Sequence, residues 1–267
     1  MKQHLRHKAI LERLEAQEYL SVEGAVALCG ASPATVRRDF NALARRGLGE
    51  RTHGGLRRPS ESGSGELPYT FREVQYSEEK AALARAAVGL LRAREVITVD
   101  GGTTTFHLAG CLPDFPLSVI TNSVRLATAL GERRLEQGTV EICLTGGYLF
   151  PELGLLAGPP TIASLGQYHA QWAFLSASGI CTEGVYNPNA FIVESERVMI
   201  ANADRVVILG DHSKIGRRSM CRVCGWDEVD VLITTAYPGQ EATLSRIQEA
   251  GVEVVEVRVG AAEAGMG

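Results

Sequence analysis

The N-terminal part of the chain carries apolar residues at helical spacing, interrupted by turn signals. The run HKAILERLEAQ places its apolar and charged residues with the period of an amphipathic helix. A shorter run, VEGAVALCG, follows Ser21, which can cap it, and ends at Gly30. Ser32 then precedes Pro33, which occupies the first position of a third run, where a helix tolerates proline. The pattern therefore predicts three consecutive short helices.

The third of these runs has one apolar and one polar face. Val36, Phe40 and Leu43 follow the i, i+4, i+7 spacing and are expected to face inward. Gly47 ends the run, and LGERTHGGL then offers two short extended pieces around a Gly-Gly turn, which predicts a small β-hairpin. Short helices followed by a hairpin are typical of a winged helix-turn-helix, whose recognition helix enters the major groove of DNA.

The pattern changes after the hairpin. The stretch RPSESGSGELP has almost nothing to bury and predicts a linker. Beyond it, apolar runs such as EVITVD, LSVITN and VEICLTGG alternate with helical runs, which predicts a parallel α/β sheet covered on both faces. The expected domains are a winged helix-turn-helix domain over 1–57, a linker over 58–75, a larger α/β domain over 76–259 and a flexible tail over 260–267.

Charge is distributed unevenly between these parts. The whole chain of 267 residues has a net charge of −4, yet residues 1–58 hold 11 Lys and Arg against 6 Asp and Glu, and the remainder holds 16 against 25. A basic N-terminal domain on an acidic chain indicates a nucleic-acid partner for that domain. No apolar run is long enough to cross a bilayer and no signal-peptide core follows Met1, so we expect a cytoplasmic protein with no membrane partner.

The third helix and the wing supply the predicted contacts to double-stranded DNA. Arg37 or Arg38 is suited to guanine or phosphate, although one of them could instead pair with Asp39. A charged scaffold or a protein-docking module is the alternative interpretation. The predicted DNA-binding residues are Ser32, Pro33, Ala34, Thr35, Arg37, Arg38, Asn41, Arg51 and His53.

Small and polar residues end several predicted strands of the larger domain. DGGTTT combines glycines, hydroxyls and the start of a predicted helix, which suits a phosphate, and Asp100 could accept hydrogen bonds from sugar hydroxyls. In an open α/β sheet, ligands bind outside the carboxyl ends of the strands, although turn and capping chemistry explains the same residues. The predicted effector site consists of Asp100, Gly101, Gly102, Thr103, Thr104, Thr105, Thr121, Asn122, Gly146, Gly147 and Lys214.

No metal or cofactor is expected. Cys221 and Cys224 form a lone C-x-x-C without further zinc ligands, and the six histidines show no metal spacing. The cysteines are expected to be reduced and mostly buried. Glu183, Glu194 and Glu196 are scattered carboxylates that we expect to be solvated or capping.

ATVRRDFNALARRG followed by ERTHGG resembles the signature of the DeoR family of bacterial transcriptional regulators. FREVQYSEEKAALARAA, VDGGTTTFHLA, VITNSVRLATAL, LTGG, SASGI, YNPN and DHSKIG follow in the family's order, over about residues 5 to 258. The resemblance implies an effector domain similar to ribose-5-phosphate isomerase that senses a phosphorylated sugar or related intermediate, usually relieving repression of a catabolic operon. It also implies that the DGGTTT loop, the TN and GG strand ends and Lys214 form the effector pocket. Lys80 matches the family's Glu-Lys pair, where a structural role fits equally well, and Phe71 and Arg72 match an element after the linker. FIVESERVMI departs from the family pattern, with Glu196 near the position of a family lysine.

Two further functions compete with a DNA-binding repressor. One is a sugar-phosphate isomerase-like enzyme with an accessory DNA-binding domain, but the chain has neither a DGADE-like segment nor a Lys-Gly-Gly run. The other is a protein-interaction module, which does not account for the exposed arginines. We therefore predict a regulator rather than an enzyme, working as a homodimer or homotetramer because winged-helix dimers read paired half-sites.

Overall fold

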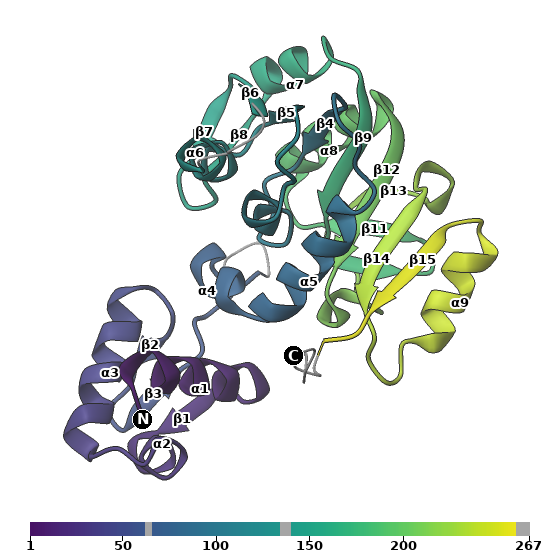
Figure 1. Ribbon diagram of the computed structural model, residues 1–267. Helices are drawn as coiled ribbons and strands as arrows, with labels where there is room; N and C mark the ends of the chain where they lie inside the picture. The colour runs from purple at the N-terminus through teal and green to yellow at the C-terminus, as the bar shows by residue number, and fades with distance from the viewer. Residues whose placement is uncertain (62–65, 134–139, 260–267) are drawn as a thin grey trace, which may run out of the picture. The chain divides into compact units, whose positions relative to one another are not determined.

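The computed structural model describes residues 1–61, 66–133 and 140–259, and the predicted tail lies outside these residues (Figure 1). The chain divides into two compact units, the first over Met1–Ser77 and the second from Glu78 onward. The first unit contains α1 (Gln3–Ala16), β1 (Tyr19–Ser21), α2 (Val22–Cys29), α3 (Pro33–Arg45), β2 (Glu50–Arg51), β3 (Gly55–Arg57) and α4 (Tyr69–Val74). Its strands form a small antiparallel sheet in the order β1-β3-β2.

Local sequence chemistry sets the boundaries of the short helices. The Ser21 hydroxyl accepts a hydrogen bond from the Gly24 N–H at 2.9 Å, and Gly30 ends α2 in the left-handed region, where glycine is favoured. The Ser32 hydroxyl caps α3 in the same way, at 3.3 Å from the Thr35 N–H. Val36, Phe40 and Leu43 are fully buried, as the period predicts. The predicted helices and hairpin of a winged helix-turn-helix are therefore present.

The segment predicted as a linker is partly structured. Residues 69–74 form helix α4, and Phe71 is fully buried in the same apolar cluster as the α1 and α3 core residues. The Ser- and Gly-rich start of this segment has little to bury, but the Tyr-x-Phe spacing that follows gives two buried aromatic residues, of which Phe71 lies in the core of this unit.

The second unit is built on a parallel sheet of seven strands in the order β15-β14-β12-β9-β4-β5-β6. The chain moves from β4 through β5 to β6, returns to pair β9 with the other side of β4, and then continues outward. The strand order thus reverses between β4 and β9, where ligands of open α/β sheets bind. The strands are β4 (Val96–Val99), β5 (Leu117–Thr121), β6 (Val140–Leu144), β9 (Ala170–Ser176), β12 (Ala203–Gly210), β14 (Val231–Thr235) and β15 (Glu253–Val257).

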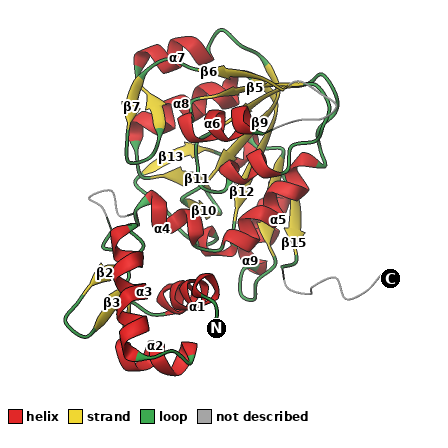
Figure 2. Ribbon diagram, turned by 60° about the vertical axis from the view of Figure 1, so that its left-hand side comes forward, coloured by secondary structure: helices red, strands yellow, loops and turns green. Residues whose placement is uncertain are grey.

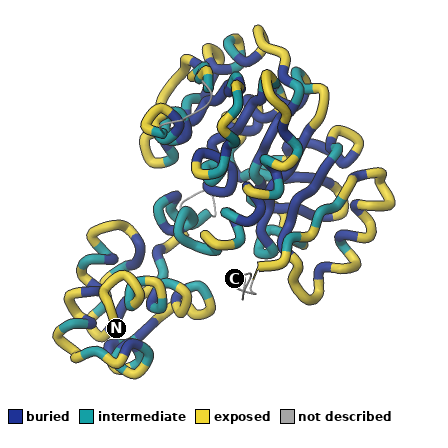
Figure 3. Tube along the Cα trace, in the orientation of Figure 1, coloured by how far each residue is buried: buried dark blue, intermediate teal, exposed yellow. Residues whose placement is uncertain are grey.

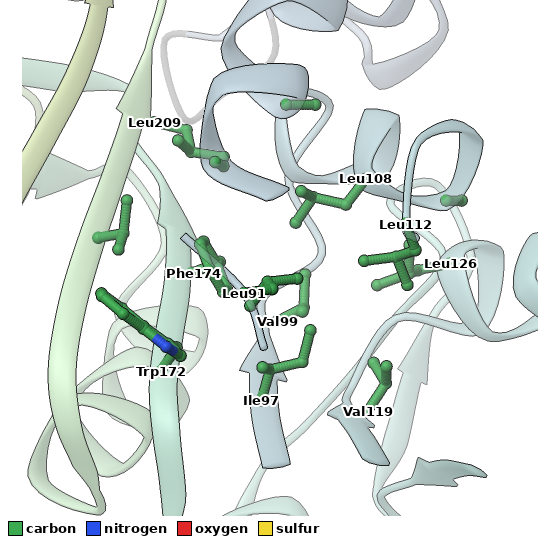
Figure 4. Packing of buried hydrophobic residues seen from close by; sticks show 14 of the residues in the cluster. Leu91, Ile97, Val99, Leu108, Leu112, Val119, Leu126, Trp172, Phe174 and Leu209 are labelled. Atoms are coloured by element: carbon green, nitrogen blue, oxygen red, sulfur yellow. The ribbon is translucent and has the colours of Figure 1, made fainter. Parts of the chain in front are cut away.

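Helices cover both faces of this sheet, as predicted (Figure 2). Trp172 and Phe174 of β9 pack on one face, and Ala173 and Leu175 on the other. The first face carries α5 (Ser77–Val88), the 3-10 helix η1 (Thr105–Gly110) and α6 (Val124–Glu132), and the second carries α8 (Ala190–Ala201) and α9 (Glu241–Glu249). Figure 3 shows the buried strands between these layers, and Figure 4 shows the packing around Phe174. The run FHLAGCL, predicted as a helix, forms only η1.

Smaller elements complete the second unit. They are the hairpin β7 (Tyr148–Phe150) and β8 (Leu155–Ala157), helix α7 (Pro159–Leu165), and the antiparallel sheet of β10 (Gly179–Cys181), β11 (Gly184–Asn187) and β13 (Cys221–Cys224). The 3-10 helices η2 (His212–Lys214) and η3 (Trp226–Glu228) follow β12 and β13. All six cysteines are free thiols, and three of them are buried. Across the described residues, no helix combines the length and apolar character needed to span a membrane.

Candidate functional site

Two exposed arginines project from the first half of α3. Arg37 and Arg38 are both exposed, and within the described part of the chain neither has an intramolecular hydrogen bond or ion pair. Asp39, which the sequence offered as a partner for one of them, points inward and is 2 % exposed. Two guanidinium groups are therefore available to an external ligand.

Asp39 instead joins α3 to α1. Its carboxylate accepts hydrogen bonds from Arg6 Nε at 2.7 Å and Arg6 Nη2 at 3.1 Å, and lies 3.1 Å from His7 Nε2. Burial alone would raise the pKa of Asp39, but the hydrogen bonds from Arg6 and His7 hold it below its usual value. This charged network fixes the helix that carries Arg37 and Arg38, and neither spacing nor period indicates it in the sequence.

Arg51 of the wing contacts the same helix. Its Nε donates to Asn41 Oδ1 at 2.9 Å, its Nη1 donates to the Gly55 carbonyl, and its guanidinium carbon lies 5.6 Å from the centroid of the Phe40 ring. Two predicted DNA-binding residues, Arg51 and Asn41, thus contact each other.

The remaining predicted DNA-binding residues lie at the start of α3 and in the wing turn. The Ser32 and Thr35 hydroxyls are 3.0 Å apart. Pro33 and Ala34 are exposed in the first turn, and His53 is exposed between β2 and β3.

In the second unit, Asp100 connects the ends of β4 and β9 at the point where the strand order reverses. One carboxylate oxygen accepts from the Gly102 N–H at 3.2 Å and from the Thr105 hydroxyl at 2.5 Å, and the other accepts from the Ser176 N–H at 2.9 Å and the Ser176 hydroxyl at 2.8 Å. Asp100 is 3 % exposed, and burial raises its pKa. The sequence suggested Asp100 as an acceptor for sugar hydroxyls, whereas both of its oxygens already accept from the chain itself.

The two glycines after Asp100 are required by packing. A Cβ on Gly101 would lie 1.7 Å from Leu155 Cδ2, and one on Gly102 would lie 1.7 Å from the Ser176 hydroxyl oxygen. Both glycines belong to the predicted effector site, and this packing requires glycine there whether or not a ligand is bound. The expected helix start is also different, because the short 3-10 helix η1 begins only at Thr105.

The three threonines of the loop are buried. Thr103, Thr104 and Thr105 are at most 5 % exposed, and the Thr105 hydroxyl is bonded to Asp100. The hydroxyl of Thr121, at the end of β5, is likewise engaged, donating to the Val99 carbonyl at 2.7 Å and accepting from the Ser123 N–H at 3.0 Å.

Unsatisfied polar atoms lie at the ends of β5 and β6. The Asn122 amide nitrogen donates to the Leu156 carbonyl at 3.0 Å, but its Oδ1 is buried without a hydrogen bond. The Thr145 hydroxyl is also buried without a hydrogen bond. The backbone N–H of Thr145 donates to the Thr121 carbonyl and so joins the ends of β5 and β6. Gly146 and Gly147 follow as exposed residues, and Gly147 has a φ of 139° that strongly favours glycine. Buried polar atoms without partners mark positions where a ligand or water can bind.

A charged group ends β12, next to β9 in the sheet. Asp211 is fully buried, and one of its oxygens, Oδ2, has no hydrogen bond. Burial would raise the pKa of Asp211, but the positive charges of Lys214 and Lys80 outweigh this and hold it below its usual value. Lys80 is 2 % exposed on α5, whereas Lys214 is partly exposed. The segment GDHSKIG is recognisable in the sequence as a strand end that offers Asp211, but the predicted effector site takes only Lys214 from it.

Two further carboxylates, Glu79 and Glu196, are held by internal contacts. Glu79, Asp211 and His212 place potential metal-ligand atoms within 4.8 Å of one another. Glu79 Oε2 already accepts from the Thr235 hydroxyl at 2.6 Å and lies 2.8 Å from His212 Nδ1, so an internal network accounts for it. Glu196, expected to be solvated or capping, is instead 1 % exposed and accepts from Asn187 at 2.9 Å.

Comparison with known proteins shows the class of this chain, a DNA-binding transcriptional regulator with a separate sensor domain. The family description "DeoR-like helix-turn-helix domain" matches residues 6–62, and "DeoR C terminal sensor domain" matches residues 75–236. The chain belongs to the DeoR family of transcriptional regulators. The family resemblance and the predicted fold class, a winged helix-turn-helix plus a parallel-sheet α/β domain, are therefore confirmed.

Several regulators are similar over nearly the full length. The chain is 35% identical over 253 residues to HTH-type transcriptional regulator GlpR of Haloferax volcanii, covering 94% of this chain and 96% of the relative. It is 32% identical to the glycerol-3-phosphate regulon repressor of Escherichia coli K12, covering 89% and 93%. It is 29% identical to HTH-type transcriptional regulator UlaR of Shigella dysenteriae, covering 94% and 98%. These relatives favour a regulator over the isomerase alternative.

Solved structures give only weak likenesses. Ribose 5-phosphate isomerase A from Methanocaldococcus jannaschii has a TM-score of 0.34 and 17% identity, covering 51% of this chain and 52% of the other. Translation initiation factor eIF-2B from Pyrococcus horikoshii has a TM-score of 0.41 and 16% identity, covering 87% and 82%. Scores this low support no statement about activity.

Proposed function

We propose that this regulator binds operator DNA through α3 and the wing, and that a phosphorylated sugar or related metabolite controls its DNA affinity. It represses a carbohydrate catabolic operon and acts by binding rather than by catalysis. It works as a homodimer or homotetramer, because paired half-sites in DNA match a symmetric dimer.

The observation that carries the effector part is the set of unsatisfied buried atoms at strand ends on either side of the point where the strand order reverses. Among the described residues, Asn122 Oδ1, Thr145 Oγ1 and Asp211 Oδ2 are buried without hydrogen bonds at the carboxyl ends of β5, β6 and β12. Hydroxyl groups of a sugar would donate to the amide and carboxylate oxygens, and these strand ends flank the point where the strand order reverses.

The positive charge for a phosphate comes from two lysines. The positive charges of Lys80 and Lys214 both lower the pKa of Asp211, the buried carboxyl group that follows β12. In this proposal Lys214, the more exposed of the two, contacts the phosphate. The similarity to the glycerol-3-phosphate regulon repressor supports a phosphorylated metabolite as the effector class.

The DGGTTT loop has a different part in this proposal. Asp100, Gly101 and Gly102 shape the floor of the site, because their contacts are with Ser176 and Leu155. Thr103 and Thr104 line it, and Gly146 and Gly147 form its exposed rim. In this proposal the ligand is selected by the atoms that lack partners within the protein, Asn122 Oδ1, Thr145 Oγ1 and Asp211 Oδ2.

Fluorescence anisotropy on DNA from upstream of the coding sequence tests this proposal. Titration at fixed salt should show binding that one of a panel of phosphorylated sugars releases. Lys214→Ala should keep the DNA affinity and lose that release. Arg246→Ala is the matched control, since Arg246 is an exposed cation that pairs with Glu249 on the same helix. Loss of DNA binding by a folded Lys214→Ala variant would contradict the separation of the two roles.

A further inference from the structure

Arg51 has an arrangement that a simple phosphate contact does not require. It is exposed on β2, yet two of its nitrogens donate to groups of the protein, Asn41 Oδ1 on α3 and the Gly55 carbonyl on β3. Its guanidinium also lies over the face of Phe40, a fully buried residue of α3. One side chain therefore joins the recognition helix to both strands of the wing.

We infer that Arg51 is a positioning residue that fixes how Asn41 reads DNA. This inference rests on the DNA-binding function of the family. Arginine has only donors, so the Asn41 atom that faces it is the amide oxygen. The Asn41 amino group is then left as the donor for an acceptor on a base edge, such as purine N7 or thymine O4. Without Arg51, the amide of exposed Asn41 can rotate and present either atom.

The geometry also distinguishes this role from that of a positive charge that either arginine or lysine could supply. A planar guanidinium can donate to Asn41 and Gly55 while stacking on Phe40, whereas the single ammonium of lysine cannot reproduce that set. Arg57, on β3 of the same wing, is the matched control. It is exposed, and its side chain is paired with Glu50 at 2.7 Å. A lysine can keep that ion pair.

The test uses the full chain and a duplex that the wild-type protein selects from a randomised DNA library. Affinity is measured for this duplex and for single-base variants of it, over a range of salt concentrations. Asn41→Ala first identifies the base pair at which discrimination depends on Asn41. Arg51→Lys should then lose about tenfold in discrimination at that base pair. The Arg51→Lys variant should keep the salt dependence and the affinity for unrelated DNA. Arg57→Lys should leave the discrimination, the salt dependence and the affinity for unrelated DNA unchanged.

A double-mutant cycle completes the test. If Arg51 acts through Asn41, adding Arg51→Lys to Asn41→Ala causes little further loss of discrimination. The inference is overturned if Arg51→Lys discriminates like the wild type while Arg51→Ala weakens binding to all sequences and lowers the salt slope by about 1, because that is the behaviour of a phosphate contact. A wild-type protein that enriches no site would contradict sequence-specific recognition itself, and this inference with it.

Discussion

Replacing Asp39 with alanine should destabilise the N-terminal unit while leaving the sensor domain intact. The variant leaves the guanidinium of Arg6 without its bidentate partner, and His7 loses its contact with the same carboxylate. Removing one partner of a buried ion pair costs about 3–5 kcal/mol. Because the Arg6 and His7 side chains keep 13% exposure, water can partly solvate them, and about 2–4 kcal/mol is expected here.

The two tryptophans make this loss measurable in the full chain. Trp172 and Trp226 both lie in the second unit, so tryptophan fluorescence during urea unfolding follows that unit. Hydrogen exchange of the α3 amides follows the first. Asp39→Ala should speed α3 exchange by about 30- to 1000-fold where exchange proceeds through unfolding of the unit, and should not move the tryptophan transition.

The matched control is an ion pair on the surface. Glu12 is exposed and lies 3.9 Å from Lys8 on α1, so Glu12→Gln should change α3 exchange by less than about threefold, as expected for an exposed pair. An Asp39→Ala variant that exchanges as slowly as Glu12→Gln would refute the reasoning that a buried charge network holds α3 on α1.

Three other outcomes follow from the structure. The pKa of Asp39 is lower in the folded than in the unfolded state, so the stability that Asp39 contributes is complete above the unfolded-state pKa of about 3.9 and is lost as the pH falls through the folded-state pKa. Protection of the α3 amides from exchange should therefore drop in acid, and Asp39→Asn should remove this pH dependence. Gly102→Ala should lower the free energy of unfolding of the second unit by about 1–3 kcal/mol through overpacking, seen as a lower urea midpoint of tryptophan fluorescence. Gly131→Ala, where a Cβ meets nothing within 4 Å, should leave that midpoint unchanged. Asp100→Asn replaces one acceptor with a donor that faces an N–H group, and should both lower that midpoint and abolish effector release in the anisotropy assay.

Local chemistry made the N-terminal helices predictable. Ser21 and Ser32 stand directly before the helices they cap, and Val36, Phe40 and Leu43 show the period of a buried face, so these features need no knowledge of distant residues. The parallel sheet was predictable for the same reason, because strands buried on both faces give continuous apolar runs. The helix α4 was missed, since the Ser- and Gly-rich residues before it dominate the composition of that segment.

The partners of the site residues were out of reach of sequence reasoning. Asp39 binds Arg6 across 33 residues, and Asp100 binds Ser176 across 76. A polar residue at a strand end has the same local signature whether it faces a ligand or a neighbouring loop. Only the fold shows that Asp100 is internally satisfied while the Asn122 Oδ1 atom is not.

The packing of the DGGTTT loop changes what that motif says about the protein. Its aspartate and glycines are held by Ser176 and Leu155, which are parts of the chain and would be there for any ligand. The motif therefore joins the ends of β4 and β9 at the centre of the sheet through contacts that need no ligand. In the proposed effector site, selection of the metabolite then falls to less conspicuous positions such as Asn122 and Thr145, where an oxygen still lacks a partner.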